Sequence, residues 1–322
     1  MNKRHALRLL PALVLGLAGP LAGAQTFPDR PITLVVPFAP GASADGIARI
    51  VGRELGAALG QQVVVDNKPG GGGATGLIVV AKSAADGYTI GLGATGAIAV
   101  NPHLSDAAPL NPETQLDPVG KLADIPLVVV TGAKSGLNTL QAVIDKARQT
   151  EVTCGNSGNY TSQHLAAELL ASMARVKLTS IPYRGSAPAV TDLLGGQTTL
   201  AVVDLTSAYP HVKSGSLRAL GLTSAARSKV APEIPTVAEA GVPGYAATGW
   251  MGLFMPKGVP APVAARLSQE LGKVLAKPDV QAQILALAAE PAYLDGAQFG
   301  AFIAAESKKW SQVIATIPKP AK

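Results

Sequence analysis

The sequence is poor in the residue types that hold metals, form disulfides or stack against nucleic-acid bases. Its 322 residues include one cysteine and four histidines; aromatic side chains make up 4% and charged side chains 15%. A single cysteine excludes an intrachain disulfide and any zinc or iron–sulfur cluster held by cysteines. No two of the histidines after residue 24 share the helical spacing of metal ligands. We therefore expect no metal site, and the scarcity of aromatics argues against a base-stacking surface.

The chain has instead the composition of a protein with a large buried core. Hydrophobic residues make up 48%, which rules out intrinsic disorder. The formal net charge is +6, and the first 24 residues supply half of it because they hold three bases and no acid. No cluster of five or more Lys and Arg is present. We expect no nucleic-acid partner, whereas the mild positive balance is compatible with a small anionic ligand.

The first 24 residues have the pattern of an export signal. Lys3, Arg4 and Arg8 accompany a 13-residue apolar stretch at residues 9–21, and Ala22-Gly23-Ala24 is a cleavage site of the A-x-A type. The apolar stretch is shorter than the roughly 18–20 residues that span a bilayer. We expect a signal peptide that is cleaved after Ala24 and a periplasmic mature chain. No cysteine lies near the cleavage site, so we expect no lipid anchor.

Short β-branched runs alternate with amphipathic segments along the rest of the chain. The pattern predicts strands at residues 32–37, 63–66, 88–92, 127–131, 152–154, 178–183, 200–205, 217–223 and 250–256. It predicts helices at residues 47–58, 77–83 and 137–149, another that carries Leu165, Leu169 and Met173, and a helical tail that starts at Pro262 and ends near Trp310. Strands that alternate with helices imply mostly parallel sheets that are covered by helices on both faces.

The strand–helix series restarts after residue 126, which indicates an α/β fold with two lobes. We expect residues 25–126 to form the first lobe, residues 127–249 the second, and residues 250–322 to return to the first lobe with the C-terminal helices. Closure is expected to be a hinge motion through the crossing strands near residues 127–131 and 249–254.

Two glycine-rich segments do not meet the requirements of nucleotide-binding motifs. Gly91, Gly93 and Gly96 match G-x-G-x-x-G after a strand, but Asn101-Pro102 interrupts the helix that a dinucleotide fold needs there. Residues 70–76 lack the Lys-[Ser/Thr] of a phosphate-binding loop. We therefore expect no cofactor.

Two other segments share a pattern that favours an anion. Residues 38–45 and 155–161 are polar or glycine-rich loops that follow a strand and precede a helix. Helix N-termini carry free N–H groups and the positive end of the helix dipole, so two such loops across a cleft would hold an anion. An alternative is an exported serine hydrolase that uses Ser43 and His164, although position 45 lacks the second glycine of the G-x-S-x-G elbow.

Many ordered segments resemble the solute receptors of tripartite tricarboxylate transporters, the Bug family. The resemblance covers essentially the whole mature chain. Its segments are residues 31–45, 60–76, 86–89, 101–104, 164–169, 181–188, 192–197, 218–224, 234–241, 250–256 and Trp310. It implies a type II-like periplasmic binding protein that closes on a small mono- or dicarboxylate and delivers it to inner-membrane permease subunits. It also implies a monomer without enzymatic activity. A sensory adaptor that presents the ligand to a membrane kinase remains a further alternative.

The resemblance also implies a ligand site in the cleft, with the proximal carboxylate between the two loops. The implied site residues are Phe38, Pro40, Gly41, Ala42, Ser43, Asp45, Thr95, Asn156, Ser157, Gly158, Asn159, Tyr160, Thr161, Ser162, Tyr183 and Asp204. The chain departs from the family pattern at Ala42, Ala44 and Tyr160, where the family usually has glycine, threonine and glycine. Asp204 either faces the ligand, which would favour an amino or hydroxy acid, or caps a structural element.

Overall fold

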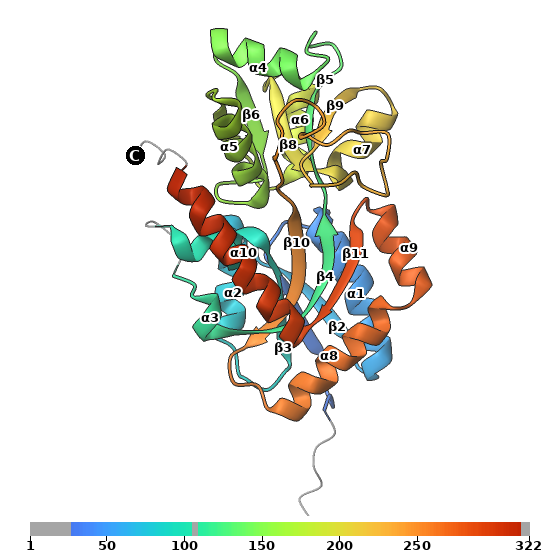
Figure 1. The fold of residues 1–322 in the computed structure, drawn as a ribbon. Helices are drawn as coiled ribbons and strands as arrows, with labels where there is room; N and C mark the ends of the chain where they lie inside the picture. The colour runs from blue at the N-terminus through green and yellow to red at the C-terminus, as the bar shows by residue number, and fades with distance from the viewer. Residues whose placement is uncertain (1–26, 105–108, 317–322) are drawn as a thin grey trace, which may run out of the picture.

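The computed structural model describes residues 27–104 and 109–316, so the predicted leader and its cleavage site lie outside the described residues. Two sheets organise the chain into the two lobes that are seen in Figure 1. The six-stranded sheet has the order β11-β4-β10-β3-β1-β2, and the five-stranded sheet has the order β7-β6-β8-β5-β9. The two-lobed α/β fold expected from the sequence is confirmed.

The first sheet combines strands from both ends of the chain. Its strands are β1 (Ile32–Val36), β2 (Val63–Asn67), β3 (Thr89–Ala94), β4 (Leu116–Ile125), β10 (Gly249–Pro256) and β11 (Glu290–Asp295). Strand β1 pairs in parallel with β2 and β3, whereas β10 pairs antiparallel with β3 and β4, and β11 antiparallel with β4. The sheet is therefore mixed and not mostly parallel, because β4 leaves it for the second lobe and β10 returns in the opposite direction.

The second sheet is mixed for the same reason. Its strands are β5 (Leu127–Gly132), β6 (Thr153–Asn156), β7 (Thr179–Pro182), β8 (Leu200–Asp204) and β9 (Leu217–Leu222). Strand β6 is parallel to β7 and β8, but β5, which enters from the first lobe, is antiparallel to β8 and β9. The carboxyl ends of β1, β3, β6 and β8 consequently face the region between the lobes.

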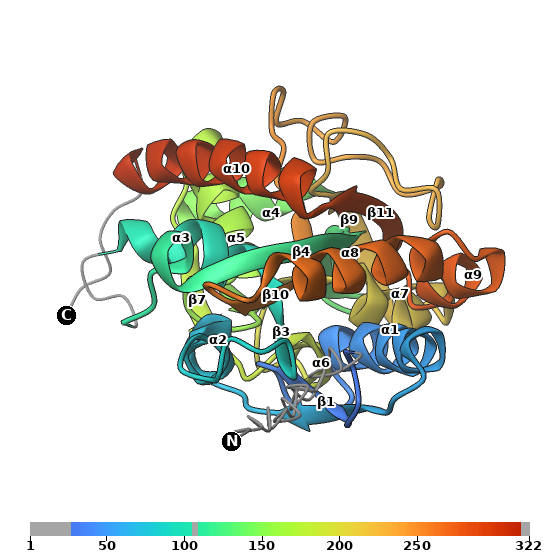
Figure 2. The same ribbon diagram turned by 90° about the horizontal axis from the view of Figure 1, so that it is seen from below.

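Helices cover both faces of each sheet. The first sheet is covered by α1 (Ser43–Leu59), α2 (Ala74–Ala81), α3 (Pro112–Gln115), α8 (Ala261–Leu275), α9 (Pro278–Ala286) and α10 (Gly296–Thr316). Helices α8 and α9 pack against α1, while α2 and α10 lie on the other side of the sheet (Figures 1 and 2). No helix in the described part of the chain is long and apolar enough to cross a bilayer.

Helices on both faces of the second sheet explain the apolar run at residues 127–130 of β5. It is flanked by α4 (Leu140–Gln149), α5 (Ser162–Ala174), α6 (Ser186–Leu194) and α7 (Leu205–Lys213). Val128 and Val130 belong to the buried cluster that contains α6 and α7 side chains, whereas Val129 belongs to the cluster of α4 and α5. Alternate side chains point to opposite faces of a strand, so burial of both faces requires the continuous apolar run.

Two neighbouring chain crossings connect the lobes. Pro126 joins β4 to β5, and residues 223–248 lead back to β10. Thr223 is buried and ties the crossings together, since its N–H donates to the Leu127 carbonyl at 2.9 Å and its hydroxyl donates to the Ala247 carbonyl at 2.5 Å. These contacts fix where the chain passes from one lobe to the other. In the described part of the chain, few backbone segments connect the lobes there.

Candidate ligand-binding site

Two adjacent cavities lie between the lobes. The inner cavity has a volume of about 30 Å³, which is room for about two water molecules. The outer cavity has a volume of about 750 Å³, within the range of ligand sites. The cavities share Phe38, Gly72, Gly96 and Ser157 in their walls. In this arrangement the outer cavity has room for a small organic ligand, whereas the inner cavity does not.

Helix α1 presents an uncapped N-terminus to the inner cavity. Its N-cap is Ala42, whose methyl side chain makes no hydrogen bond to the first turn. Ser43 and Ala44 line the cavity, and no hydrogen bond from their N–H groups is found among the described residues. Unpaired N–H groups at a helix N-terminus attract anions.

Asp45 holds the loop before α1 through hydrogen bonds made outside the cavity walls. Its carboxylate accepts hydrogen bonds from Gly41 N–H at 3.0 Å, from the Arg49 guanidinium at 2.9 Å and from the Asn67 amide at 3.0 Å. Burial alone would raise the pKa of the Asp45 carboxyl, but these hydrogen bonds outweigh burial and lower that pKa. Gly41 has φ +82°, a backbone conformation that favours glycine. Asp45 and Gly41 thus hold the path of the loop and do not line either cavity.

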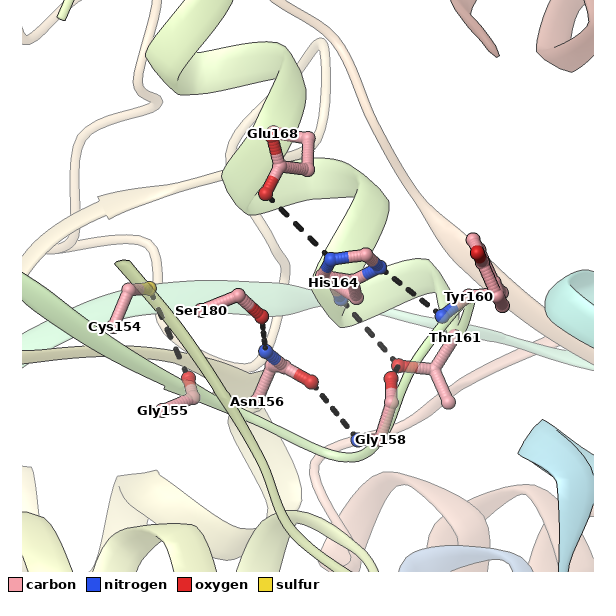
Figure 3. A network of polar contacts seen from close by, with 9 residues as sticks. All are labelled: Cys154, Gly155, Asn156, Gly158, Tyr160, Thr161, His164, Glu168 and Ser180. Atoms are coloured by element: carbon pink, nitrogen blue, oxygen red, sulfur yellow. Dashed lines mark hydrogen bonds and ion pairs between the residues drawn. The ribbon is translucent and has the colours of Figure 1, made fainter. Parts of the chain in front are cut away.

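The loop before α5 is held by the polar network in Figure 3. The Asn156 side chain accepts from Gly158 N–H at 2.9 Å and donates to Ser180 at 2.8 Å. His164 Nδ1 accepts the Tyr160 N–H at 3.0 Å, and His164 Nε2 lies 3.6 Å from the Glu168 carboxylate. The network supports Tyr160, which adopts φ +62° although it has a bulky side chain.

Helix α6 contributes a third N-terminus, which the sequence did not predict. Its N-cap is Gly185, which has no side chain, and Gly185 and Ser186 line the inner cavity. Ser186 Oγ lies 2.7 Å from Ser157 Oγ and accepts the Asp204 N–H at 3.1 Å. The signal was present in the sequence, since residues 179–186 repeat the pattern of strand, short loop with glycine and serine, and helix.

Asp204 lies where the three helix N-termini meet. It is 4% exposed, and its carboxylate accepts a hydrogen bond from Ser43 Oγ of the first lobe at 2.5 Å. Gln163 Nε2, at the start of α5, donates to the other carboxylate oxygen. Burial raises the pKa of the Asp204 carboxyl, although its hydrogen bonds partly oppose that rise. Asp204 therefore joins the two lobes through neutral donors.

The structure brings most of the predicted site residues to the cavity walls. The inner wall contains Phe38, Ala42, Ser43, Ser157, Thr161, Ser162 and Asp204. The outer wall contains Phe38, Ser157, Gly158, Asn159, Tyr160 and Tyr183. The predicted residues outside both walls are Pro40, Gly41, Asp45, Thr95 and Asn156. Thr95 supports the wall by accepting the Trp250 N–H at 3.0 Å. Besides Ser186, sequence reasoning missed Gln163 and Arg184.

The side chains that a serine hydrolase or a metal site would use have other partners in this structure. Ser43 donates to Asp204, and the two ring nitrogens of His164 face Tyr160 and Glu168. Burial raises the pKa of the Cys154 thiol to about 12, so the thiolate nucleophile is scarce at neutral pH. Within the described residues, no group of three or more His, Cys, Asp or Glu side chains could hold a metal ion.

Known proteins share both the sequence pattern and this architecture. The family model described as "Tripartite tricarboxylate transporter family receptor" matches residues 47–318. BugT of Bordetella pertussis is 39% identical over 302 residues, which cover 93% of this chain and 92% of BugT. The solved structure of the periplasmic binding protein BugD is 32% identical with a TM-score of 0.83, over 90% of this chain and 98% of BugD.

Two further solved structures are complexes with carboxylates. A protein of R. palustris with adipate is 32% identical with a TM-score of 0.86, over 90% of this chain and 98% of its own. A protein of Rhodopseudomonas palustris with bound malate is 28% identical with a TM-score of 0.83, over 89% of this chain and its own full length, 100%.

Proposed function

Because the chain belongs to the receptor family of tripartite tricarboxylate transporters, whose members are solute-binding receptors and not enzymes, we propose that it captures a small organic carboxylate in the periplasm. It then delivers this ligand to the inner-membrane permease subunits of such a transporter. The ligand is a mono- or dicarboxylate, as supported by the adipate and malate complexes of its structural neighbours.

The observation that carries the proposal is the convergence of three helix N-termini on one cavity. Helices α1, α5 and α6 place Ser43, Ser162 and Ser186 in the inner wall. Backbone N–H groups and hydroxyls there bind the proximal carboxylate, and helix dipoles stabilise its charge. Arg184, which is exposed in the outer wall, places a positive charge near the distal end of the ligand.

Ligand capture uses the hinge between the lobes. Residues 25–126 and 250–322 move as one lobe, and residues 127–249 move as the other. In the closed arrangement Ser43 meets Asp204, so the lobes separate to admit a ligand and then close on it. The paired crossings at Pro126 and Thr223 act as the hinge, because few backbone segments connect the lobes there.

A thermal-shift screen of the mature chain, residues 25–322, tests the proposal. At about 100 times Kd a ligand adds about 2.7 kcal/mol to the free energy of unfolding. For a protein of this size, this gain raises Tm by about 5–10 °C, at about 2–4 °C per kcal/mol. Methyl esters of the same compounds are the control, since they keep the carbon skeleton and lose the charge. A lack of any shift with mono- and dicarboxylates at millimolar concentration contradicts the receptor proposal.

A further inference from the structure

Asp204 is the charged residue of the inner cavity. The other side chains of that wall are apolar or neutral polar, with glycines at Gly72, Gly96, Gly185 and Gly249. A site that binds only a carboxylate gains nothing from a second carboxylate in its wall, because two like charges in a small cavity repel. The proposed carboxylate-binding function alone does not explain why an acid lies in this wall. The inference below rests on that proposed function and adds a role for Asp204.

Asp204 does not act as a helix cap. It occupies the N-cap position of α7, where aspartate commonly accepts a hydrogen bond from the first turn, yet its side chain makes no such bond. The carboxylate instead points to the start of α1 and the start of α5, through Ser43 and Gln163. The capping role that the sequence left open for Asp204 is therefore not the one that its side chain performs at α7.

Asp204 also lacks a counter-charge. Its carboxylate is buried and its donors are a hydroxyl and a side-chain amide, both neutral. No basic side chain of the described residues forms an ion pair with it. By contrast, Asp45 is equally buried and is paired with Arg49. Buried charges are normally paired, so Asp204 is left to be paired by a group from outside the chain.

The position of Asp204 relative to the start of α1 determines which atom of the ligand would carry the group that pairs with Asp204. Ser43 supplies an uncapped N–H in the first turn of α1, and its own hydroxyl is 2.5 Å from the Asp204 carboxylate. A ligand carboxylate that is bound at the start of α1 therefore lies next to Asp204. A group on the adjacent carbon atom of the ligand can reach Asp204, whereas a group at the distal end would point to the outer cavity.

We propose that Asp204 is a specificity-determining residue that selects carboxylates with an ammonium group on the carbon next to the carboxylate, that is, α-amino acids. The ammonium group displaces the Ser43 and Gln163 donors, pairs with Asp204 and offsets the repulsion between the two carboxylates. An asparagine would accept from Gln163 through its amide oxygen and donate through its amide nitrogen to the Ser43 hydroxyl oxygen. It would offer no charge to a cationic ligand.

The experiment is calorimetric titration of the mature chain with matched compounds. Three carbon skeletons are used, namely propanoate, butanedioate and hexanedioate, each unsubstituted, with a 2-hydroxyl and with a 2-amino group. We expect the 2-amino compound to bind at least tenfold more tightly than the unsubstituted one in every skeleton that binds. This ranking is measured on the natural protein and requires no variant to fold.

Asp204→Asn then assigns the preference to the residue. We expect the variant to lose at least tenfold in affinity for the 2-amino compound and to bind the unsubstituted carboxylate at least as well as before. Asp117→Asn is the matched control: Asp117 is an acid of β4 that pairs with Lys257 and lies in neither cavity wall. We expect it to leave both affinities unchanged, and melting curves confirm that each variant is folded.

The outcomes separate this inference from the proposed function. Equal binding of substituted and unsubstituted carboxylates overturns the role of Asp204 and leaves the carboxylate receptor intact. An amino preference that survives Asp204→Asn also overturns it. If none of the nine compounds and no other carboxylate binds, the proposed function itself fails, and this inference fails with it.

Discussion

Two buried aspartates show how the environment of a residue decides its role. Asp45 and Asp204 are both 4% exposed and both lie near the start of α1. Asp45 has a cation one helical turn away in Arg49, and hydrogen bonds lower its pKa in spite of its burial. Burial raises the pKa of Asp204, whose donors are all neutral. The first acid therefore stabilises the fold, and the second is held at a cost that a ligand can offset.

This difference predicts a pH-dependent effect of Asp204→Asn on the ligand-free protein. A carboxyl whose folded-state pKa is raised stabilises the fold at pH values below its unfolded pKa, and this contribution is lost as pH rises through the folded pKa. The variant does not titrate, and it keeps an acceptor for Gln163 and a donor for Ser43. We expect its Tm to exceed that of the natural protein by about 2–8 °C at neutral pH, for a gain of the order of 1–2 kcal/mol.

The difference in Tm should shrink as pH falls toward the ordinary range of an aspartate. Melting curves of both proteins between acid and neutral pH provide the measurement. A difference that stays constant with pH would show that the carboxylate does not carry the effect.

At the scale of elements, strands and helices with a regular apolar pattern were predicted from the sequence. Elements that are stabilised mainly by tertiary contacts were missed. The strands predicted at residues 32–37 and 127–131 are apolar except for Thr33 and Thr131, and they correspond to β1 and β5. Strand β4 was missed because Pro118, Gly120 and Lys121 interrupt its apolar pattern, although it is paired on both edges.

Elements without a regular apolar pattern were also missed at the candidate site. Helix α7 was missed because Pro210 lies inside it, and α6 was missed together with the contribution of Ser186. The two loops identified from their polar residues do line the cavities. The convergence of Gln163, Ser186 and Asp204, however, joins residues from three elements, and their spacing along the chain carries no signal for it.

The loop before α5 carries a prediction about Tyr160. Tyr160→Gly removes the unfavourable left-handed conformation of a bulky residue, worth about 1–2 kcal/mol. It also removes the ring, which makes a T-shaped contact with His164 at a centroid distance of 5.8 Å, worth about 0.5–1.5 kcal/mol. The two effects nearly cancel, so Tm should change by only a few degrees, about 2–4 °C per kcal/mol of residual difference.

The ligand ranking should nevertheless change, because the residue lies in the wall of the outer cavity. Titration with carboxylates of increasing length measures that ranking, with Tyr160→Asn as a second variant that tolerates the same backbone conformation. An unaltered ranking in both variants would mean that the ring does not face the distal end of the ligand.

At the scale of the whole molecule, the close approach of the two lobes depends on backbone contacts between them. The first lobe presents Gly72 and Gly96 to the second. A Cβ atom at Gly96 would lie 2.6 Å from the Tyr160 carbonyl oxygen and 3.1 Å from the Thr161 Cα. A Cβ atom at Gly72 would lie 3.0 Å from the Asn159 carbonyl oxygen. These glycines let the lobes approach closely enough for Ser43 to meet Asp204.

Gly96→Ala tests this dependence without disturbing either lobe by itself. The backbone at Gly96 is outside the positive-φ region, and the nearest atoms to the added methyl group all belong to the second lobe. The methyl group therefore obstructs the closed arrangement and leaves the open one unstrained. We expect ligand affinity to fall by more than tenfold while Tm of the ligand-free protein changes by less than about 2 °C, since the individual cores stay intact.

Gly132→Ala is the matched control, because a Cβ atom there would meet its nearest neighbour, the Leu193 carbonyl oxygen, at an ordinary 3.7 Å. Titration gives the affinities, and small-angle scattering with saturating ligand gives the radius of gyration. We expect the ligand-saturated Gly96→Ala protein to remain more extended than the natural protein and than Gly132→Ala. Normal affinity together with normal compaction would contradict the requirement for this glycine. Closure would then have to be limited by contacts other than the one between Gly96 and the loop before α5.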